Sequence, residues 1–150
     1  MKNVEFIGKE ITLSMILKQM EQEGKYLYWS IFSLDVIGDL GDNKSTPEFE
    51  KEIEETREGY LLTWDELCAM SHKFGVVIDC ILVACKDKQI IINLTRKYNT
   101  SEEIFPHCEI AIEIEDGDFL NIYAKNPKVV EKVIKKFGSL PVGVYRPLNI

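Results

Sequence analysis

The chain has 150 residues, a formal net charge of −7 at pH 7 and a sequence pI near 4.9. A domain of this length buries enough apolar surface to fold without disulfides or metals. The acidic surplus argues against nucleic acid as a main ligand, because phosphate binding needs clustered Lys and Arg. The N-terminus lacks the apolar core of a signal peptide, and the longest apolar run, 80–85, is too short to span a membrane. We therefore expect one soluble cytoplasmic domain, residues 1–150.

The first third of the chain predicts a helix followed by a strand. Residues 13–23 form the helix, which Thr12 can cap and Gly24 can end. Apolar residues recur in it with helical spacing, at Leu13, Ile16, Leu17 and Met20. Residues 26–35 carry aromatic or apolar side chains at both odd-numbered and even-numbered positions. Apolar side chains on both faces are typical of a strand inside a sheet.

The middle of the chain predicts two helices and two strands. A Thr-Pro pair opens a helix over 46–58, and the capping box T-x-x-E at 63–66 opens a shorter one. Residues 76–85 predict a second central strand. After a polar turn, the aliphatic run 90–95 predicts a third strand, and we expect 96–106 to be a polar connection.

The last third predicts a hairpin, a helix and a packed tail. A two-residue turn would place Ile110, Ile112 and Ile114 beside the odd-numbered positions of 119–123. One more loop residue would place them beside the even-numbered positions of 120–124, which we favour because this register collects the aliphatic side chains. Asn126 and the proline after it begin the last helix, which ends at Gly138. The apolar tail should pack back on the domain.

These elements indicate an α+β fold. We expect a mixed or mainly antiparallel sheet of about five strands, covered by about four helices.

The acidic stretch 35–43, DVIGDLGDN, matches neither an EF-hand loop nor a phosphate-binding loop, because its spacing and its neighbours are wrong for both. Its charge is more informative: residues 35–58 hold nine acids and three bases, which is −6 of the total −7. Such a surface can attract a basic partner, although a solvated helix face that only maintains solubility is the alternative. The residues selected for partner binding are Asp39, Asp42, Glu48, Glu52 and Glu55, with Glu113 from the hairpin.

The C-terminal segment carries the opposite charge. Residues 125–146 hold six bases and one acid, so the molecule is polarised and two copies can associate through their opposite patches. Ordinary stabilisation of a helix C-terminus by cations is the alternative explanation.

Asp79 is the most unusual acid, because it interrupts a strongly apolar strand. A buried carboxylate needs a partner or a shifted pKa, so Asp79 is either a perturbed functional acid or bonded to a structural donor. Cys68 and His72 are four residues apart on a helix and can touch, but no other feature activates this cysteine. The four cysteines lack metal-ligand spacing, so we expect reduced cytosolic thiols, no metal and no cofactor.

No Walker loop, nucleophile elbow, HExxH or CxxC motif occurs in the sequence. The leading hypothesis is a non-enzymatic acidic binding protein of bacterial or phage origin, an immunity or inhibitor protein. It would neutralise a basic partner, such as a nuclease toxin, by electrostatic occlusion. One alternative is a small carboxylate- or metal-dependent enzyme that uses Asp79 or the hairpin carboxylates. The other is a structural or regulatory homo-oligomer.

Overall fold

The computed structural model describes residues 2–7, 11–38, 46–56, 59–97, 101–138 and 145–149. The strands are β1 (Lys2–Ile7), β2 (Tyr28–Gly38), β3 (Tyr60–Leu62), β4 (Phe74–Cys85), β5 (Ile110–Glu115), β6 (Phe119–Ala124) and β7 (Tyr145–Asn149). The helices are α1 (Leu13–Gln19), α2 (Glu21–Gly24), α3 (Thr46–Glu55), α4 (Trp64–Ser71), α5 (Lys88–Lys97), α6 (Ser101–Ile104), the 3-10 helix η1 (Phe105–His107) and α7 (Pro127–Phe137).

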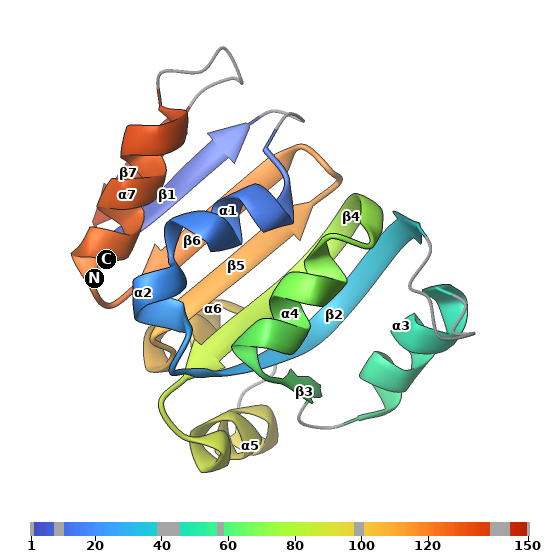
Figure 1. Ribbon diagram of the computed structural model, residues 1–150. Helices are drawn as coiled ribbons and strands as arrows, with labels where there is room; N and C mark the ends of the chain where they lie inside the picture. The colour runs from blue at the N-terminus through green and yellow to red at the C-terminus, as the bar shows by residue number, and fades with distance from the viewer. Residues whose placement is uncertain are drawn as a thin grey trace.

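Within the described residues all strands belong to one sheet, in the order β3-β2-β4-β5-β6-β1-β7 (Figure 1). Every neighbouring pair is antiparallel. The α+β class is confirmed, but the described residues contain more strands and helices than the sequence predicted. The two central predicted strands are present as β2 and β4. β1 and β3 were not predicted, and they lie on either side of this centre.

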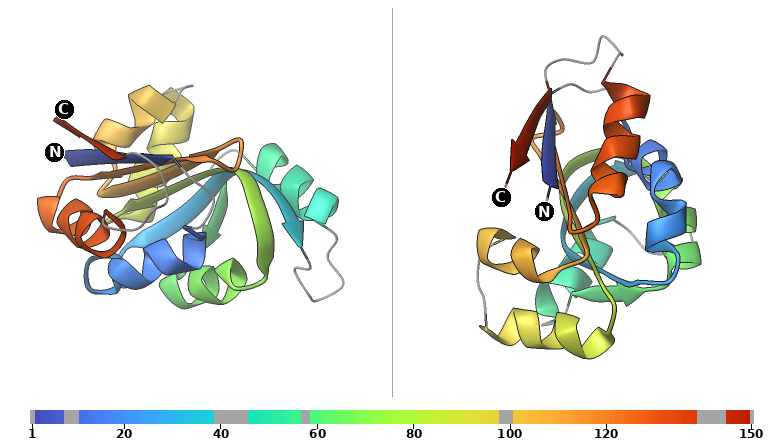
Figure 2. Two further views of the ribbon diagram at one scale, coloured as in Figure 1. Left: turned by 90° about the horizontal axis from the view of Figure 1, so that it is seen from above. Right: turned by 90° about the vertical axis from the view of Figure 1, so that its left-hand side faces the viewer.

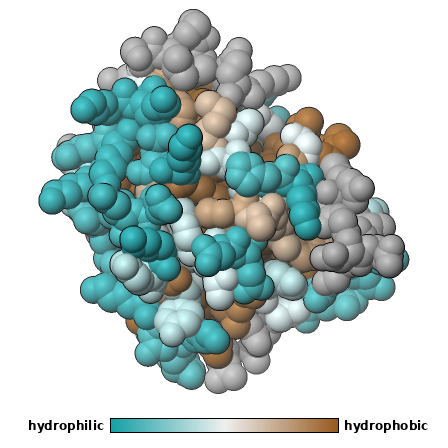
Figure 3. All heavy atoms as spheres, in the orientation of Figure 1, coloured by the Kyte–Doolittle hydropathy of each residue, from teal (hydrophilic) through white to brown (hydrophobic). Residues whose placement is uncertain are grey.

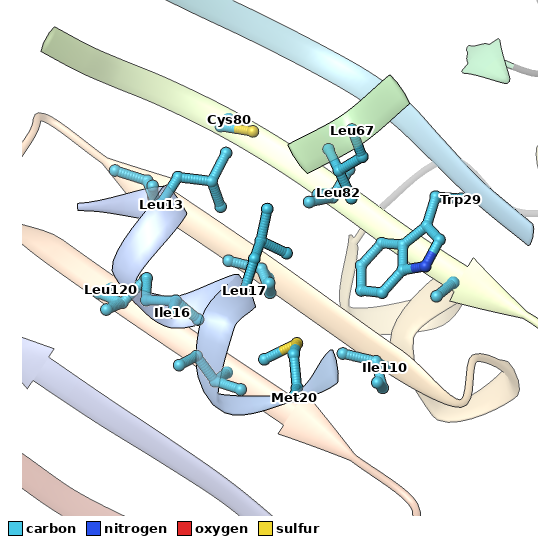
Figure 4. Close-up of a cluster of buried hydrophobic side chains, with 14 of the residues drawn as sticks. Leu13, Ile16, Leu17, Met20, Trp29, Leu67, Cys80, Leu82, Ile110 and Leu120 are labelled. Atoms are coloured by element: carbon cyan, nitrogen blue, oxygen red, sulfur yellow. The ribbon is translucent and has the colours of Figure 1, made fainter. Parts of the chain in front are cut away.

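The main core lies on one face of the sheet, under α1, α4 and α7 (Figure 2). The predicted apolar stripe of the first helix points into this core, and Leu13, Leu17 and Met20 lie over the strands (Figure 4). Thr12 caps α1 by accepting a hydrogen bond from the Met15 N–H at 3.3 Å. The helix is broken at Met20 into α1 and α2, whereas the sequence predicted one continuous helix.

Two tryptophans close the end of this core. Trp29 and Trp64 are both buried, with ring centroids 5.7 Å apart. The Trp29 indole N–H donates to the Gly24 carbonyl at 2.9 Å. A Cβ on Gly24 would lie 2.9 Å from both rings, so glycine is required where α2 meets this pair.

The opposite face of the sheet carries a second, smaller core under α5, α6 and η1 (Figure 2). Here the prediction of a strand at 90–95 is wrong, because this run lies within α5. Ile91 and Leu94, three residues apart, are the buried side chains, and Asp87 Oδ1 accepts a hydrogen bond from the Gln89 N–H at 2.8 Å at the helix start. The expected polar connection at 96–106 likewise contains the end of α5, α6 and part of η1.

The C-terminal third follows the sequence predictions closely. Ile112 pairs with Ile122 and Ile114 with Leu120, so the favoured register with a three-residue loop is confirmed. The Asn126 side chain caps α7 by accepting from the Lys128 N–H at 3.0 Å. The tail packs back as expected, with β7 antiparallel to β1.

The predicted capping box is also present. Thr63 accepts from the Glu66 N–H at 3.2 Å, and Glu66 Oε1 accepts from the Thr63 N–H at 3.1 Å. Reciprocal capping of this kind fixes the start of α4 immediately after β3.

Gly59 and Gly117 both have positive φ angles but different surroundings. A Cβ on Gly59 would lie 2.5 Å from the Ile31 carbonyl oxygen, whereas a Cβ on Gly117 would come no nearer than 3.7 Å to the Val77 oxygen. We therefore expect Gly59→Ala to lower the free energy of unfolding by about 2–4 kcal/mol. Gly117→Ala should lower it by about 1–2 kcal/mol, the backbone cost alone. Urea denaturation measures both, and equal losses would contradict the proposed clash at residue 59.

Candidate protein-binding surface

The side chains of β4 change their surroundings along the strand. Near its C-terminal end, Val83, Ala84 and Cys85 are all buried, so both faces of the sheet are covered. Nearer its start, Asp79 and Ile81 are only partly buried on the face that α5, α6 and η1 cover further along. Among the described elements, those helices therefore cover only part of this face. We call the remaining part the open half-face.

Backbone irregularities between β2 and β4 decide which side chains reach the open half-face. The register passes from Asp35 opposite Asp79 to Val36 opposite Val77, so Ile78 is an extra residue in β4. Beyond this bulge Val36 belongs to the main core. The next pair, Ile37 and Val76, alternates to the open half-face, where the two side chains are 62% and 56% exposed.

Four carboxylates lie together on the open half-face, on three adjacent strands. Asp35 of β2 is directly opposite Asp79 of β4. In β5, Glu113 pairs with Ile81, and Glu115 lies one step beyond the Cys80–Ile114 pair, beside Asp79. These four acids line a shallow depression of about 350 Å³, and the described residues that line it include no Lys or Arg.

Asp79 has a structural partner. Its Oδ1 accepts a hydrogen bond from the Asp116 N–H at 3.2 Å, so this carboxylate ties β4 to the β5–β6 turn. Asp116 itself has a positive φ of 53°, and Gly117 N–H donates to the Ile78 oxygen at 2.8 Å. The backbone donor that the sequence analysis considered is therefore present. A functional, perturbed acid at Asp79 remains a prediction.

The acidic helix α3 packs beside β2, the strand that carries Asp35 (Figure 1). Phe49 and Ile53 are its buried anchors, and Phe49 packs edge-on against Tyr60 at 4.9 Å between centroids. Glu50 Oε1 accepts a hydrogen bond from the Val36 N–H at 2.9 Å. This bond satisfies a backbone group on β2 beyond the short pairing with β3, so Glu50 is a structural acid.

The six residues predicted to bind a partner fall into three groups. Glu48, Glu52 and Glu55 are exposed on α3, where Glu55 pairs with Lys51 at 3.8 Å. Asp39 and Asp42 lie outside the described residues. Glu113 is on β5, separated from β2 by β4, so the structure groups it with Asp79 and not with α3.

Sequence reasoning did not select Asp35 and Glu115 for the binding surface. In the sequence, Asp35 is one of the nine acids of residues 35–58, and Glu115 is one of the hairpin carboxylates. Alternation along each strand could have indicated them, because residues two apart on a strand share a face. Glu115 is two residues from Glu113, and Asp35 is two residues from the exposed Ile37. The pairing of the strands, which the sequence does not state, was needed to bring the acids together.

The basic C-terminal helix lies across the sheet from the open half-face. Lys128, Lys135 and Lys136 are exposed on α7, where hydrophilic side chains gather in Figure 3. Lys132 instead pairs with Glu23 at 2.6 Å, which joins α7 to α2. The described lysines of α7 and the four clustered acids therefore occupy different faces of the molecule.

Cys68 and His72 line a common depression with Trp64 and Glu21. Burial, followed by the nearby charges of Asp65 and Glu21, raises the pKa of the Cys68 thiol. A raised pKa disfavours the nucleophilic thiolate, so this arrangement gives no support to a cysteine nucleophile.

In the described part of the chain, no group of three or more His, Cys, Asp or Glu side chains is arranged to hold a metal ion. No described helix combines the length and apolar character that a membrane span requires. Comparison with family models, curated proteins and solved structures gave no match to this chain.

Replacing Glu50 should lower the stability of the protein more than replacing Glu55, an exposed acid on the same helix. Glu50→Ala leaves the Val36 N–H without its carboxylate, and we expect a loss of about 1–2 kcal/mol in the free energy of unfolding. Glu55→Ala removes only an exposed i,i+4 pair, with an expected loss of about 0.5 kcal/mol or less. Urea denaturation compares the two variants, and equal losses would mean that the Glu50 bond does not hold α3 against β2.

Neutralising Asp35 should stabilise the protein. Like charges directly opposite each other on paired strands are unfavourable, so Asp35→Asn should raise the free energy of unfolding by about 0.5 kcal/mol at low salt. Asp65→Asn is a control of opposite sign, because Asp65 lies in the first turn of α4 and favours the helix there. Thermal and urea unfolding measure both changes. A stability loss in Asp35→Asn would show that Asp35 serves the fold.

Proposed function

We propose that this protein binds a basic protein partner through the open half-face, with α3 extending the acidic surface at its edge. The observation that carries this proposal is the cluster of Asp35, Asp79, Glu113 and Glu115 around one depression on three adjacent strands. A concentration of one charge sign raises the rate of encounter with a surface of opposite charge.

The shape and the apolar neighbours of the cluster favour a protein over a small ligand. The depression is a shallow hollow on a sheet, whereas small-molecule sites enclose most of the ligand. Ile37, Val76 and Phe119 are 62%, 56% and 40% exposed on strands that carry or adjoin the acids. Exposed apolar side chains of this kind supply short-range contacts at protein interfaces, while the charges supply orientation.

The opposition of Asp35 and Asp79 also supports a binding role. Two carboxylates on directly paired strand positions repel each other, and a neutral residue at position 35 would avoid that cost while keeping the structural bond of Asp79. A cationic side chain of a partner placed between them would reverse the sign of the interaction. The electrostatic interaction of these carboxylates is therefore repulsive in the free protein and becomes attractive in a complex with a cationic partner.

The finer proposal is an immunity or inhibitor protein that occludes a basic toxin. A nuclease active site is basic because it binds phosphate, so an acidic protein can cover it and exclude the nucleic acid. The exposed acids Glu48, Glu52 and Glu55 would then guide encounter, and the open half-face would make the close contact.

The test begins with the immobilised chain and a lysate of its source cells. Captured proteins are identified by mass spectrometry and then titrated in purified form. We expect a basic partner whose dissociation constant rises about tenfold or more between about 50 and about 300 mM salt. Asp35→Asn combined with Glu113→Gln and Glu115→Gln should weaken binding by about a hundredfold, because three charges of the contact are lost.

The matched control reverses charge on the opposite face. Lys135→Glu combined with Lys136→Glu should leave the affinity within about twofold, because α7 lies across the sheet from the acids. Retention of binding by the acid-neutralised variant, together with its loss in the α7 variant, would refute the proposed surface. A complex insensitive to salt would refute the electrostatic mechanism.

A further inference from the structure

Two cysteine side chains meet at the base of the segment that covers the second core. Cys85 is the last residue of β4, and Cys108 lies between η1 and β5. The Glu109 N–H donates to the Ala84 carbonyl at 2.9 Å, which brings the two stretches of backbone together. Both thiols are buried in the second core, where the Cys108 S–H donates to the Ile104 carbonyl oxygen at 3.5 Å and the Cys85 sulfur lies beside it.

The two thiols are electrostatically unequal. Interaction with the Cys108 thiol lowers the pKa of Cys85, which outweighs the opposing effect of burial. The same interaction, followed by burial, raises the pKa of Cys108. Glu109, Lys125 and the buried Tyr123 are the other titratable groups beside the pair. The thiolate form is therefore more accessible at Cys85 than at Cys108.

We propose that Cys85 and Cys108 form a modification site, a dithiol that a small peroxide converts reversibly to an intramolecular disulfide. The Cys85 thiolate attacks one peroxide oxygen, and the O–O bond breaks to give a sulfenic acid and hydroxide, which takes up a proton to form water. The Cys108 sulfur then attacks the Cys85 sulfur, the S–O bond breaks, and the Cys108 proton leaves with the departing hydroxide as a second water. The two thiols lose two electrons, and the peroxide gains them.

The position of the pair in the chain gives this bond a structural consequence. Residues 86–107 lie between the two cysteines and contain α5, α6 and η1, the whole described cover of the second core. A disulfide at its base would close this segment into a loop and restrict the unfolded chain. Oxidation should therefore raise Tm by about 5–10 °C.

A small oxidant must reach a buried pair, because Cys85 and Cys108 are 1% and 0% exposed. Each cysteine is next in sequence to an exposed residue, Lys86 or His107. The proposed reaction therefore requires a local movement at these two junctions, and the main core, on the other face of the sheet, can stay closed.

Cys80 provides an internal control on the same strand. It is buried in the main core, and burial alone raises its pKa to about 12. Cys68, partly exposed with a raised pKa, is a second control. Neither belongs to the second core with the pair, so neither should react at the rate of the pair.

The experiment treats the reduced full-length protein with stoichiometric hydrogen peroxide at neutral pH. Intact mass spectrometry should show the loss of two hydrogens, peptide mapping should locate the bond at Cys85–Cys108, and dithiothreitol should reverse it. Cys108→Ala should instead accumulate sulfenic acid at Cys85, detected by dimedone labelling, while Cys68→Ala should form the disulfide as the wild type does. Peptide mapping of the wild type needs no variant, so the test survives a Cys108→Ala chain that fails to fold.

Three results would overturn the proposal. The first is oxidation of Cys68 or Cys80 before the pair. The second is a disulfide with a different partner. The third is formation of the Cys85–Cys108 bond only in denaturant, which would show that the folded protein keeps the two thiols from reacting.

Discussion

The arrangement of this protein depends on a change in burial along β4. At its C-terminal end the strand is apolar on both faces, so helices must cover both: α1, α4 and α7 on one side, and α5, α6 and η1 on the other. Nearer its start, one face carries Asp79 beside Asp35 and Glu115, and the described helices leave it open. A carboxylate at position 79 is tolerable only where water reaches it. The end of the second core and the start of the acidic surface are therefore one boundary.

The same boundary separates the two chemical features of the molecule. On the covered side, burial brings Cys85 and Cys108 together at the base of a helical segment. On the open side, strand pairing gathers acids that repel one another, with Ile37, Val76 and Phe119 exposed around them. Stability would favour neutral or mixed charge at these positions. We propose that their acidic character serves attraction to a partner, which is the basis of the proposed function.

Sequence patterns predicted elements well where local chemistry and tertiary packing agree. The Thr63 capping box and the pairing of Ile112 with Ile122 are examples. The capping box specifies where α4 begins, and side-chain alternation specifies which residues pair across the hairpin. The run at 90–95 failed because its β-branched residues favour a strand locally, while packing on the second core selects a helix that buries Ile91 and Leu94. The candidate site was predictable only in part. The bulge at Ile78 and the pairing of Asp35 with Asp79 are properties of the sheet, so no single segment reveals them.

The central claim is that the open half-face is uncovered and strongly negative in solution. NMR relaxation enhancement of backbone amides by a cationic, an anionic and a neutral nitroxide measures both properties residue by residue, without a partner. We expect the cationic probe to broaden the amides near Asp35, Asp79 and Glu115 far more than the anionic probe does, and the reverse near Lys135. Equal effects of the two charged probes there, or protection from the neutral probe as well, would show that the acids are neutralised or covered and would contradict the account.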